Sequence, residues 1–187
     1  MTELTVIDNF LDSSEFEELS GIMSSDGFPW FFNNYISYHQ EAQTTEVFQF
    51  VHAFYNSDLP LSNYFNILEK LLIRINPFCI LRIKANLLTR TEEIIEYGLH
   101  SDTQDPNLMT AVLYLNTNNG YTVFESGEKV NSIENRIAFF PSNLVHAGSS
   151  CTDQKRRMVI NIVYYPTNVN QVRILNDNWL NKGKASS

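Results

Sequence analysis

A histidine and an aspartate stand two positions apart, at His100 and Asp102, within the stretch 97–102. Alternate residues of an extended chain point to the same side, so this imidazole and this carboxylate can share one site. A second histidine, His146, follows further along the chain. Two imidazoles and one carboxylate are the ligand set of a non-haem Fe(II) facial triad, which leaves positions open for a bidentate acid and dioxygen. The sequence therefore predicts His100, Asp102 and His146 as metal ligands.

An arginine pair opens a β-favouring stretch at 156–165. Strand alternation puts Arg157 on the same face as Asn161, and Arg156 on the opposite face with the apolar residues. We therefore expect Arg157, rather than Arg156, to point into the sheet interior. A buried arginine needs an anion, and its planar fork suits a carboxylate. Tyr114, on the strand expected after Asp102, can offer its hydroxyl to the same anion.

The elements that must position these residues are β-strands. Five apolar, β-favouring segments are separated by polar turns, and they are 79–87, 109–116, 121–125, 137–140 and 156–165. No helical period interrupts this region. Successive strands without intervening helices favour an antiparallel sandwich or barrel.

The N-terminal half is expected to supply covering helices. Asp12 followed by Glu15 resembles a capping box and predicts a helix through Met23. Ser62 predicts the start of a second helix, which must end before Pro77. Further expected segments are strands at 4–7 and 47–51 and a short helix in the tail after 167.

Composition limits the classes of protein and of partner. The chain has 187 residues and is 43% hydrophobic, enough for one sizeable core, so we expect a single domain over 1–187. The formal charge of −8 argues against nucleic acid and anionic lipid as partners. Cys79 and Cys151 show no metal-type spacing and are expected to be reduced. With no signal-like N-terminus and no apolar run of membrane length, we expect a cytoplasmic protein.

The motifs occur in a characteristic order. They are His100-Ser101-Asp102, Tyr114-Leu115-Asn116, Gly120-Tyr121-Thr122-Val123-Phe124, Phe140-Pro141-Ser142-Asn143-Leu144-Val145-His146, and Arg157 with Asn161. This series resembles that of the 2-oxoglutarate and Fe(II)-dependent oxygenases, in particular the prolyl 4-hydroxylase-like group. The resemblance covers roughly residues 80–165, about half of the chain.

The resemblance implies a mainly β fold, a double-stranded β-helix or jelly roll of the cupin type, with the N-terminal helices packed on one face. The β core that carries the motifs would span about 79–166. By position, the resemblance implies iron binding by His100, Asp102 and His146, with Arg157 on the distal carboxylate of 2-oxoglutarate. It gives Tyr114 as the hydroxyl partner of that carboxylate, and Asn161 and Thr110 as further residues of the same pocket.

The implied activity is that of a dioxygenase using Fe(II), 2-oxoglutarate and O2, with ascorbate as an accessory reductant. It would hydroxylate a C–H bond, first of all in a prolyl residue of a peptide or protein, and convert 2-oxoglutarate to succinate and CO2. Two alternatives stay open. One is an oxygenase acting on a free amino acid or small metabolite, and the other is a non-catalytic cupin-like module that binds a metal or ligand.

Other features of the sequence are expected to be structural. His39 and His52 are interpreted as structural histidines, although His39-Gln40-Glu41 forms a rival metal-type triplet. The acidic stretch 89–99 is expected to be a mobile loop over the site. Family members often carry a tyrosine on the strand before the His-x-Asp triplet, and Leu87 is the expected match.

Overall fold

The computed structural model describes residues 4–36 and 48–167. The N-terminal half contains β1 (Thr5–Ile7), α1 (Ser13–Ser24), β2 (Phe31–Asn33), β3 (Gln49–Asn56), β4 (Leu59–Pro60), a 3-10 helix (Phe65–Leu68) and α2 (Glu69–Ile75). The second half contains β5 (Pro77–Thr89), β6 (Met109–Tyr114), β7 (Tyr121–Phe124), β8 (Lys129–Asn131), β9 (Ile137–Pro141), β10 (His146–Gly148) and β11 (Arg156–Pro166).

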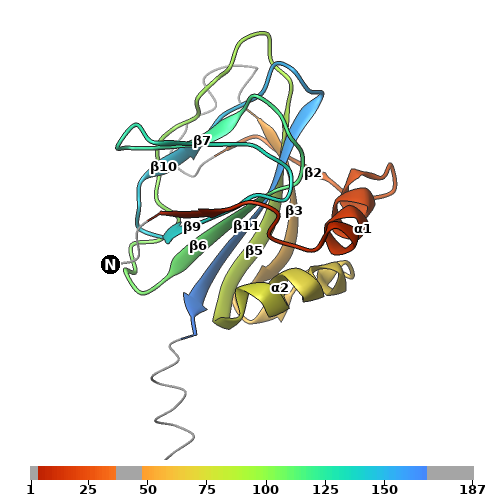
Figure 1. Ribbon diagram of the computed structural model, residues 1–187, viewed down its shortest axis with the longest axis vertical. Helices are drawn as coiled ribbons and strands as arrows, with labels where there is room; N and C mark the ends of the chain where they lie inside the picture. The colour runs from red at the N-terminus through yellow and green to blue at the C-terminus, as the bar shows by residue number, and fades with distance from the viewer. Residues whose placement is uncertain (1–3, 37–47, 168–187) are drawn as a thin grey trace, which may run out of the picture.

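These strands form two antiparallel sheets. The large one is eight-stranded, in the order β1-β9-β6-β11-β5-β3-β2 with β4 added to β3, and the small one has the order β10-β7-β8. Figure 1 shows α1 and α2 together on one side of the large sheet, with β7 and β10 on the other. The expected mainly β, double-stranded β-helix fold with helices on one face is therefore confirmed.

Strand alternation divides the interior into two clusters. On the helix side, Ile83 of β5 and Ile160 of β11 pack in one cluster with Met23 of α1 and with Leu71 of α2. Between the sheets lies a second, smaller cluster, which includes Val112, Tyr114, Phe124, Phe140 and Val159. The polar site residues share the side of the second cluster, because their positions alternate with those of the first.

Both predicted helices are present, but they begin differently from the expectation. α1 follows Asp12, whose side chain makes no capping hydrogen bond and instead lies 3.1 Å from Arg74 Nη2. Ser62 accepts a hydrogen bond from the Tyr64 amide, and a 3-10 turn precedes α2. The second helix ends at Ile75, and its C-cap Asn76, in the left-handed region at φ 53°, directly precedes Pro77 at the start of β5.

The five strands predicted in the second half are all present, and two short ones, β8 and β10, were not expected. Each of these spans three residues, too few for a recognisable alternating pattern. The strand expected at 47–51 is longer and runs to Asn56. The tail helix expected after 167 lies outside the described residues. Within the described residues, neither helix combines the length and the hydropathy needed to cross a membrane.

Candidate metal centre

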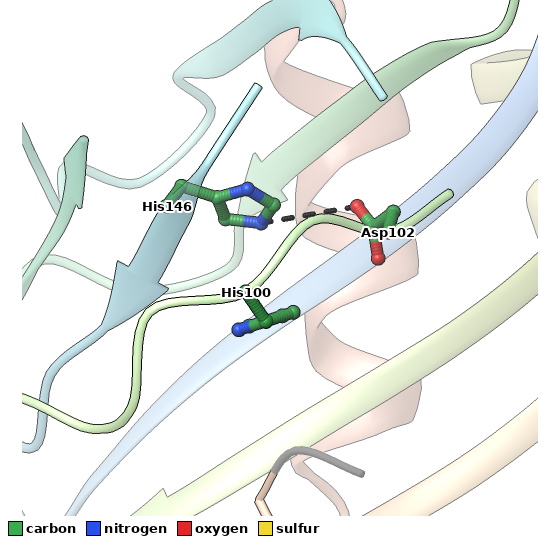
Figure 2. Close-up of side chains that lie close together, drawn as sticks. All are labelled: His100, Asp102 and His146. Atoms are coloured by element: carbon green, nitrogen blue, oxygen red, sulfur yellow. Dashed lines mark ion pairs between the residues drawn. The ribbon is translucent and has the colours of Figure 1, made fainter. Parts of the chain in front are cut away.

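The two histidines of the predicted triad are joined through their backbones. His100 donates its amide to the carbonyl of His146 at 2.9 Å, and His146 donates back at 2.8 Å. This isolated antiparallel bridge fastens the segment before Asp102 to β10, which itself pairs with β7. The bridge brings the histidine that follows β9 beside the one that follows β5. Figure 2 shows both imidazoles and the carboxylate of Asp102 gathered in one place.

A hydrogen bond to a backbone carbonyl orients each imidazole. Nδ1 of His100 lies 3.1 Å from the carbonyl of Gly98, and Nδ1 of His146 lies 2.9 Å from that of Leu144. A carbonyl only accepts hydrogen bonds, so each Nδ1 carries the proton and each Nε2 keeps its lone pair for a metal. Nε2 of His146 lies 3.8 Å from Oδ2 of Asp102. One potential ligand atom from each of the three residues lies within 4.8 Å of the others, an arrangement that fits a single divalent ion.

Asp102 is held from three sides. Its Oδ1 accepts a hydrogen bond from Arg82 Nη2 at 2.6 Å, and its Oδ2 accepts one from Thr110 Oγ1 at 2.8 Å. Asn161 Nδ2 lies 3.4 Å from the same Oδ2. Burial alone would raise the pKa of this carboxyl, but electrostatic interactions with His146, Arg82 and Lys84 outweigh it, so the pKa lies below its ordinary value. Asp102 is therefore an anion when a metal arrives.

The histidine environment also favours metal binding. Burial, followed by the electrostatic interaction with the neighbouring His146, lowers the pKa of His100 below its ordinary value of 6.5. At neutral pH the ring is therefore uncharged, which is the state that coordinates a metal.

A pocket extends from the triad between the two sheets. The residues that line it beside the triad include Lys84, Asn86, Val112, Thr122, Arg157 and Asn161. These residues come from β5, β6, β7 and β11, so the walls of the pocket belong to regular strands rather than to loops. A site on strands holds its side chains in fixed directions.

The far end of the pocket holds Arg157, a buried cation that is only 3% exposed. Its Nε donates to Ser132 Oγ at 2.7 Å and its Nη2 donates to Thr122 Oγ1 at 3.2 Å. No carboxylate of the described residues forms an ion pair with this guanidinium, so its charge is uncompensated. Arg156 faces the other way, where its Nη2 donates to the carbonyl of Ser24 in α1 at 3.1 Å. The alternation thus puts Arg157 on the pocket side, as its parity with Asn161 predicts.

Two predicted residues, Tyr114 and Thr110, lie behind the pocket wall. The hydroxyl of Tyr114 donates to Thr122 Oγ1 at 2.8 Å, and its ring lies 5.5 Å from the Arg157 guanidinium carbon. Thr110 bonds to Asp102 and lies 2.9 Å from Ser142 Oγ. Both side chains are fully buried and support residues that face the pocket.

Sequence reasoning missed Arg82 and Lys84. Both stand at alternate positions of β5, between residues that enter the apolar core, and this polar spacing was the available signal. The match proposed for the family tyrosine also needs correction. Leu87 belongs to the helix-side core, whereas its neighbours Asn86 and Leu88 line the pocket, because one residue of shift changes the face.

The structure tests two of the remaining predictions, namely a structural role for His52 and a mobile loop at 89–99. His52 has Nδ1 2.7 Å from the carbonyl of Pro29 and Nε2 2.7 Å from Ser62 Oγ, which is a structural setting. The triplet that begins at His39 lies outside the described residues. The segment after β5 is not the loose loop we expected, since the amides of Ile95 and Tyr97 donate to Ser150 Oγ and to the Gly148 carbonyl.

The sequence matches no protein-family model, and no curated protein matches it. Solved structures do match. A prolyl hydroxylase from Trichoplax adhaerens, in complex with a hypoxia inducible factor oxygen degradation domain peptide fragment, superposes with a TM-score of 0.56 at 14% identity. The match covers 87% of this chain and 83% of that one.

Two further structures agree. A 2OG-Fe(II) oxygenase family oxidoreductase from Burkholderia pseudomallei gives a TM-score of 0.60 at 12% identity, covering 89% of this chain and 88% of the other. HygX from Streptomyces hygroscopicus, with nickel and 2-oxoglutarate bound, gives 0.57 at 13% identity, covering 89% and 84%. The chain has the double-stranded β-helix fold that is found in 2-oxoglutarate and Fe(II)-dependent oxygenases, the prolyl hydroxylases among them.

Proposed function

We propose that this protein is a 2-oxoglutarate- and Fe(II)-dependent dioxygenase that hydroxylates a C–H bond. One observation carries the proposal: a single pocket has a His/Asp/His cluster at one end and the uncompensated Arg157 at the other. A metal site alone would suit a hydrolase or a binding module equally well. A buried guanidinium beyond it adds a place for a carboxylate on a molecule that also reaches the metal.

The residues have distinct roles in this proposal. His100, Asp102 and His146 hold the Fe(II), and Arg157 binds the distal carboxylate of 2-oxoglutarate. Thr122 accepts a hydrogen bond from the guanidinium, and the ring of Tyr114 lies 5.5 Å from the guanidinium carbon. Fe(II), when bound with 2-oxoglutarate and O2, supplies the oxidation that turns C–H into C–OH and leaves succinate and CO2. Ascorbate would serve as an accessory reductant.

The other side chains contribute geometry. Arg82 and Thr110 donate to the two carboxylate oxygens of Asp102, and Oδ2 lies 3.8 Å from Nε2 of His146. Asn161 reaches the same oxygen from β11. A ligand carboxylate fixed by hydrogen bonds presents the same geometry at each turnover, which lowers the cost of assembling the site.

The proposed substrate class is a prolyl residue in a peptide or protein. The likeness to a prolyl hydroxylase with a bound peptide supports this choice. A free amino acid or small metabolite is the alternative, because one fold serves many substrates. Incubation with a library of proline-containing peptides, followed by mass spectrometry, tests the choice. A gain of one oxygen on a prolyl residue is expected, whereas a gain only on free amino acids would favour the alternative.

Succinate formation from 2-oxoglutarate tests the reaction class. The wild-type protein with Fe(II), 2-oxoglutarate and O2 should form succinate, and Asp102→Ala should abolish it because an anionic metal ligand is gone. Asp105→Ala is a matched control, since Asp105 lies outside the triad and its carboxylate bonds to Tyr165 and Asn107 instead. Undiminished succinate formation by Asp102→Ala would show that the triad assignment is wrong.

A further inference from the structure

Lys84 is a second cation in the pocket, and it is not one of the proposed metal ligands. Strand β5 alternates between its two faces, so Ile83 and Ala85 enter the core while Arg82, Lys84 and Asn86 turn toward the pocket. The side chain is half-buried and lines the pocket beside His100 and Asp102.

The two polar neighbours of Lys84 on β5 already have partners. Arg82 pairs with Asp102 at 2.6 Å, and Asn86 donates to Gln49 Oε1 at 2.6 Å. Lys84 forms neither a hydrogen bond nor an ion pair with the residues in 4–36 and 48–167. Burial and the charge of Arg82 lower the pKa of Lys84 to about 8. The charge of Asp102 opposes this shift, but that carboxylate already accepts hydrogen bonds from Arg82 and Thr110, so the ammonium group can still bind an anion brought by a ligand.

The strand register separates Lys84 from the proposed cosubstrate anchor. Lys84 pairs with Asn161, whereas Arg157 pairs with Leu88, four residues along β5. At the rise of a β-strand this spacing is about 13 Å. Asp102 lies near the Lys84 level, because Asn161 Nδ2 is 3.4 Å from its Oδ2. A dicarboxylate that runs from the triad to Arg157 therefore extends away from Lys84.

In the part of the chain that the structure describes, a small exposed residue lies beside Lys84 on the next strand. On the neighbouring strand β3, the residue paired with Lys84 is Ala53, which is exposed and has a small side chain. Paired residues of adjacent strands point to the same face. A molecule that approaches over Ala53 would therefore meet the amine of Lys84 before it reaches the metal ligands.

We propose that Lys84 binds a carboxylate of the substrate and so places the reactive carbon beside the metal centre. The proposal rests on the proposed oxygenase function and narrows its substrates to carboxylate-bearing molecules. A single ammonium group matches one carboxylate in charge. That carboxylate belongs either to a free amino acid or to an acidic residue beside the reactive position of a peptide, and the experiment separates these two sources.

Pairs of compounds in which a carboxylic acid is replaced by its amide test whether Lys84 binds a carboxylate. L-proline is compared with L-prolinamide, and N-acetyl-Pro-Glu-amide with N-acetyl-Pro-Gln-amide, so each pair differs in one carboxylate. Binding is followed by NMR of protein whose lysines carry 13C-methyl groups, which keeps their charge. The protein is loaded with Zn(II) and saturating 2-oxoglutarate, so the readout needs no turnover. The resonance that Lys84→Arg removes belongs to Lys84.

An acid should shift the Lys84 resonance, and its amide should not. In the active Fe(II) enzyme, the preferred acid should bind about tenfold more tightly than its amide, as expected for a charged hydrogen bond. Lys84→Met should lose this preference and Lys84→Arg should keep it. Lys70→Met on the exposed face of α2 is the matched control for removing one lysine.

Three results would overturn the proposal: no acid shifts the Lys84 resonance, an amide shifts it equally, or Lys84→Met weakens 2-oxoglutarate binding as much as Arg157→Ala does. The last would make Lys84 a cosubstrate anchor. Failure of the oxygenase function has a separate signature, since the Fe(II)-loaded protein would then not bind 2-oxoglutarate while acids still shifted the Lys84 resonance.

Discussion

Asp102 shows how a single ligand is prepared by its neighbours. Its carboxylate lies in a largely buried position where an unpaired charge would be unfavourable, and Arg82 supplies both an opposite charge and a 2.6 Å hydrogen bond. Thr110 fixes the other oxygen from β6. The metal therefore meets a carboxylate that is already ionised and already oriented.

Arg82→Gln should weaken metal binding, because it removes the charge and the hydrogen bond that orient Asp102. Loss of such an outer partner typically costs about tenfold or more in metal affinity. Titration of the metal-free protein with Co(II) measures the dissociation constant. Arg90→Gln, at an exposed position just past β5, is the matched control. Equal metal affinity in Arg82→Gln and wild type would refute this role for Arg82.

The half-buried imidazole of His100 makes the metal-free protein sensitive to acid. Burial lowers its pKa in the folded state below 6.5, so between the folded and unfolded values the unfolded chain binds more protons. Stability should therefore fall as the pH drops below about 6.5. Urea unfolding of the metal-free protein should give a lower free energy of unfolding at pH 5.5 than at pH 7.5. His100→Gln should reduce this difference, and an unchanged difference would contradict the account.

At the scale of elements, the approach of β7 to β11 depends on Gly120, the residue before β7. A Cβ at this position would lie 2.6 Å from the Ser150 carbonyl oxygen and 2.8 Å from Arg157 Cδ. Only a residue without a side chain lets the turn approach the arginine so closely. The glycine thus belongs to the architecture of the proposed carboxylate anchor.

Gly120→Ala should therefore displace Arg157 and lower stability by about 1–3 kcal/mol, the usual cost of overpacking. It should also raise the 2-oxoglutarate concentration needed for half-maximal succinate formation. Gly21→Ala is the matched control, because that glycine lies within α1 with no atom near its Cβ position. The control should be as stable as wild type or more stable. Wild-type stability of Gly120→Ala in thermal unfolding would contradict the close packing seen here.

Strand alternation explains how much of the site was predictable. The parity of Arg157 with Asn161 is a local property of β11, and it gives the pocket side correctly. The same rule applied to β5 would have found Arg82 and Lys84. Their partners could not have been found this way, because Arg82 lies on β5 whereas its partner Asp102 lies within the long connection between β5 and β6. Local patterns specify a face, whereas pairing across a loop depends on the tertiary fold.

At the scale of the whole molecule, the two faces of the large sheet have different roles. Its helix side packs against α1 and α2 and forms the larger core, and its other side faces the small sheet and carries the pocket. The eight-stranded order places β11 between β5 and β6, so that all three strands contribute to one site. This order was not readable from the sequence, since strands adjacent in the sheet are far apart in the chain.

The central claim is that one pocket binds Fe(II) at the triad and 2-oxoglutarate between the triad and Arg157. Anaerobic titration of the Fe(II)-loaded protein with 2-oxoglutarate tests it through the weak visible charge-transfer absorbance of the chelate. We predict that wild type and Arg156→Ala develop this absorbance at similar 2-oxoglutarate concentrations. Arg157→Ala should need a 2-oxoglutarate concentration about 10- to 100-fold higher to develop it. Asp102→Ala should not develop it at all. Wild-type protein that holds Fe(II) and shows no such absorbance at saturating 2-oxoglutarate would contradict the account.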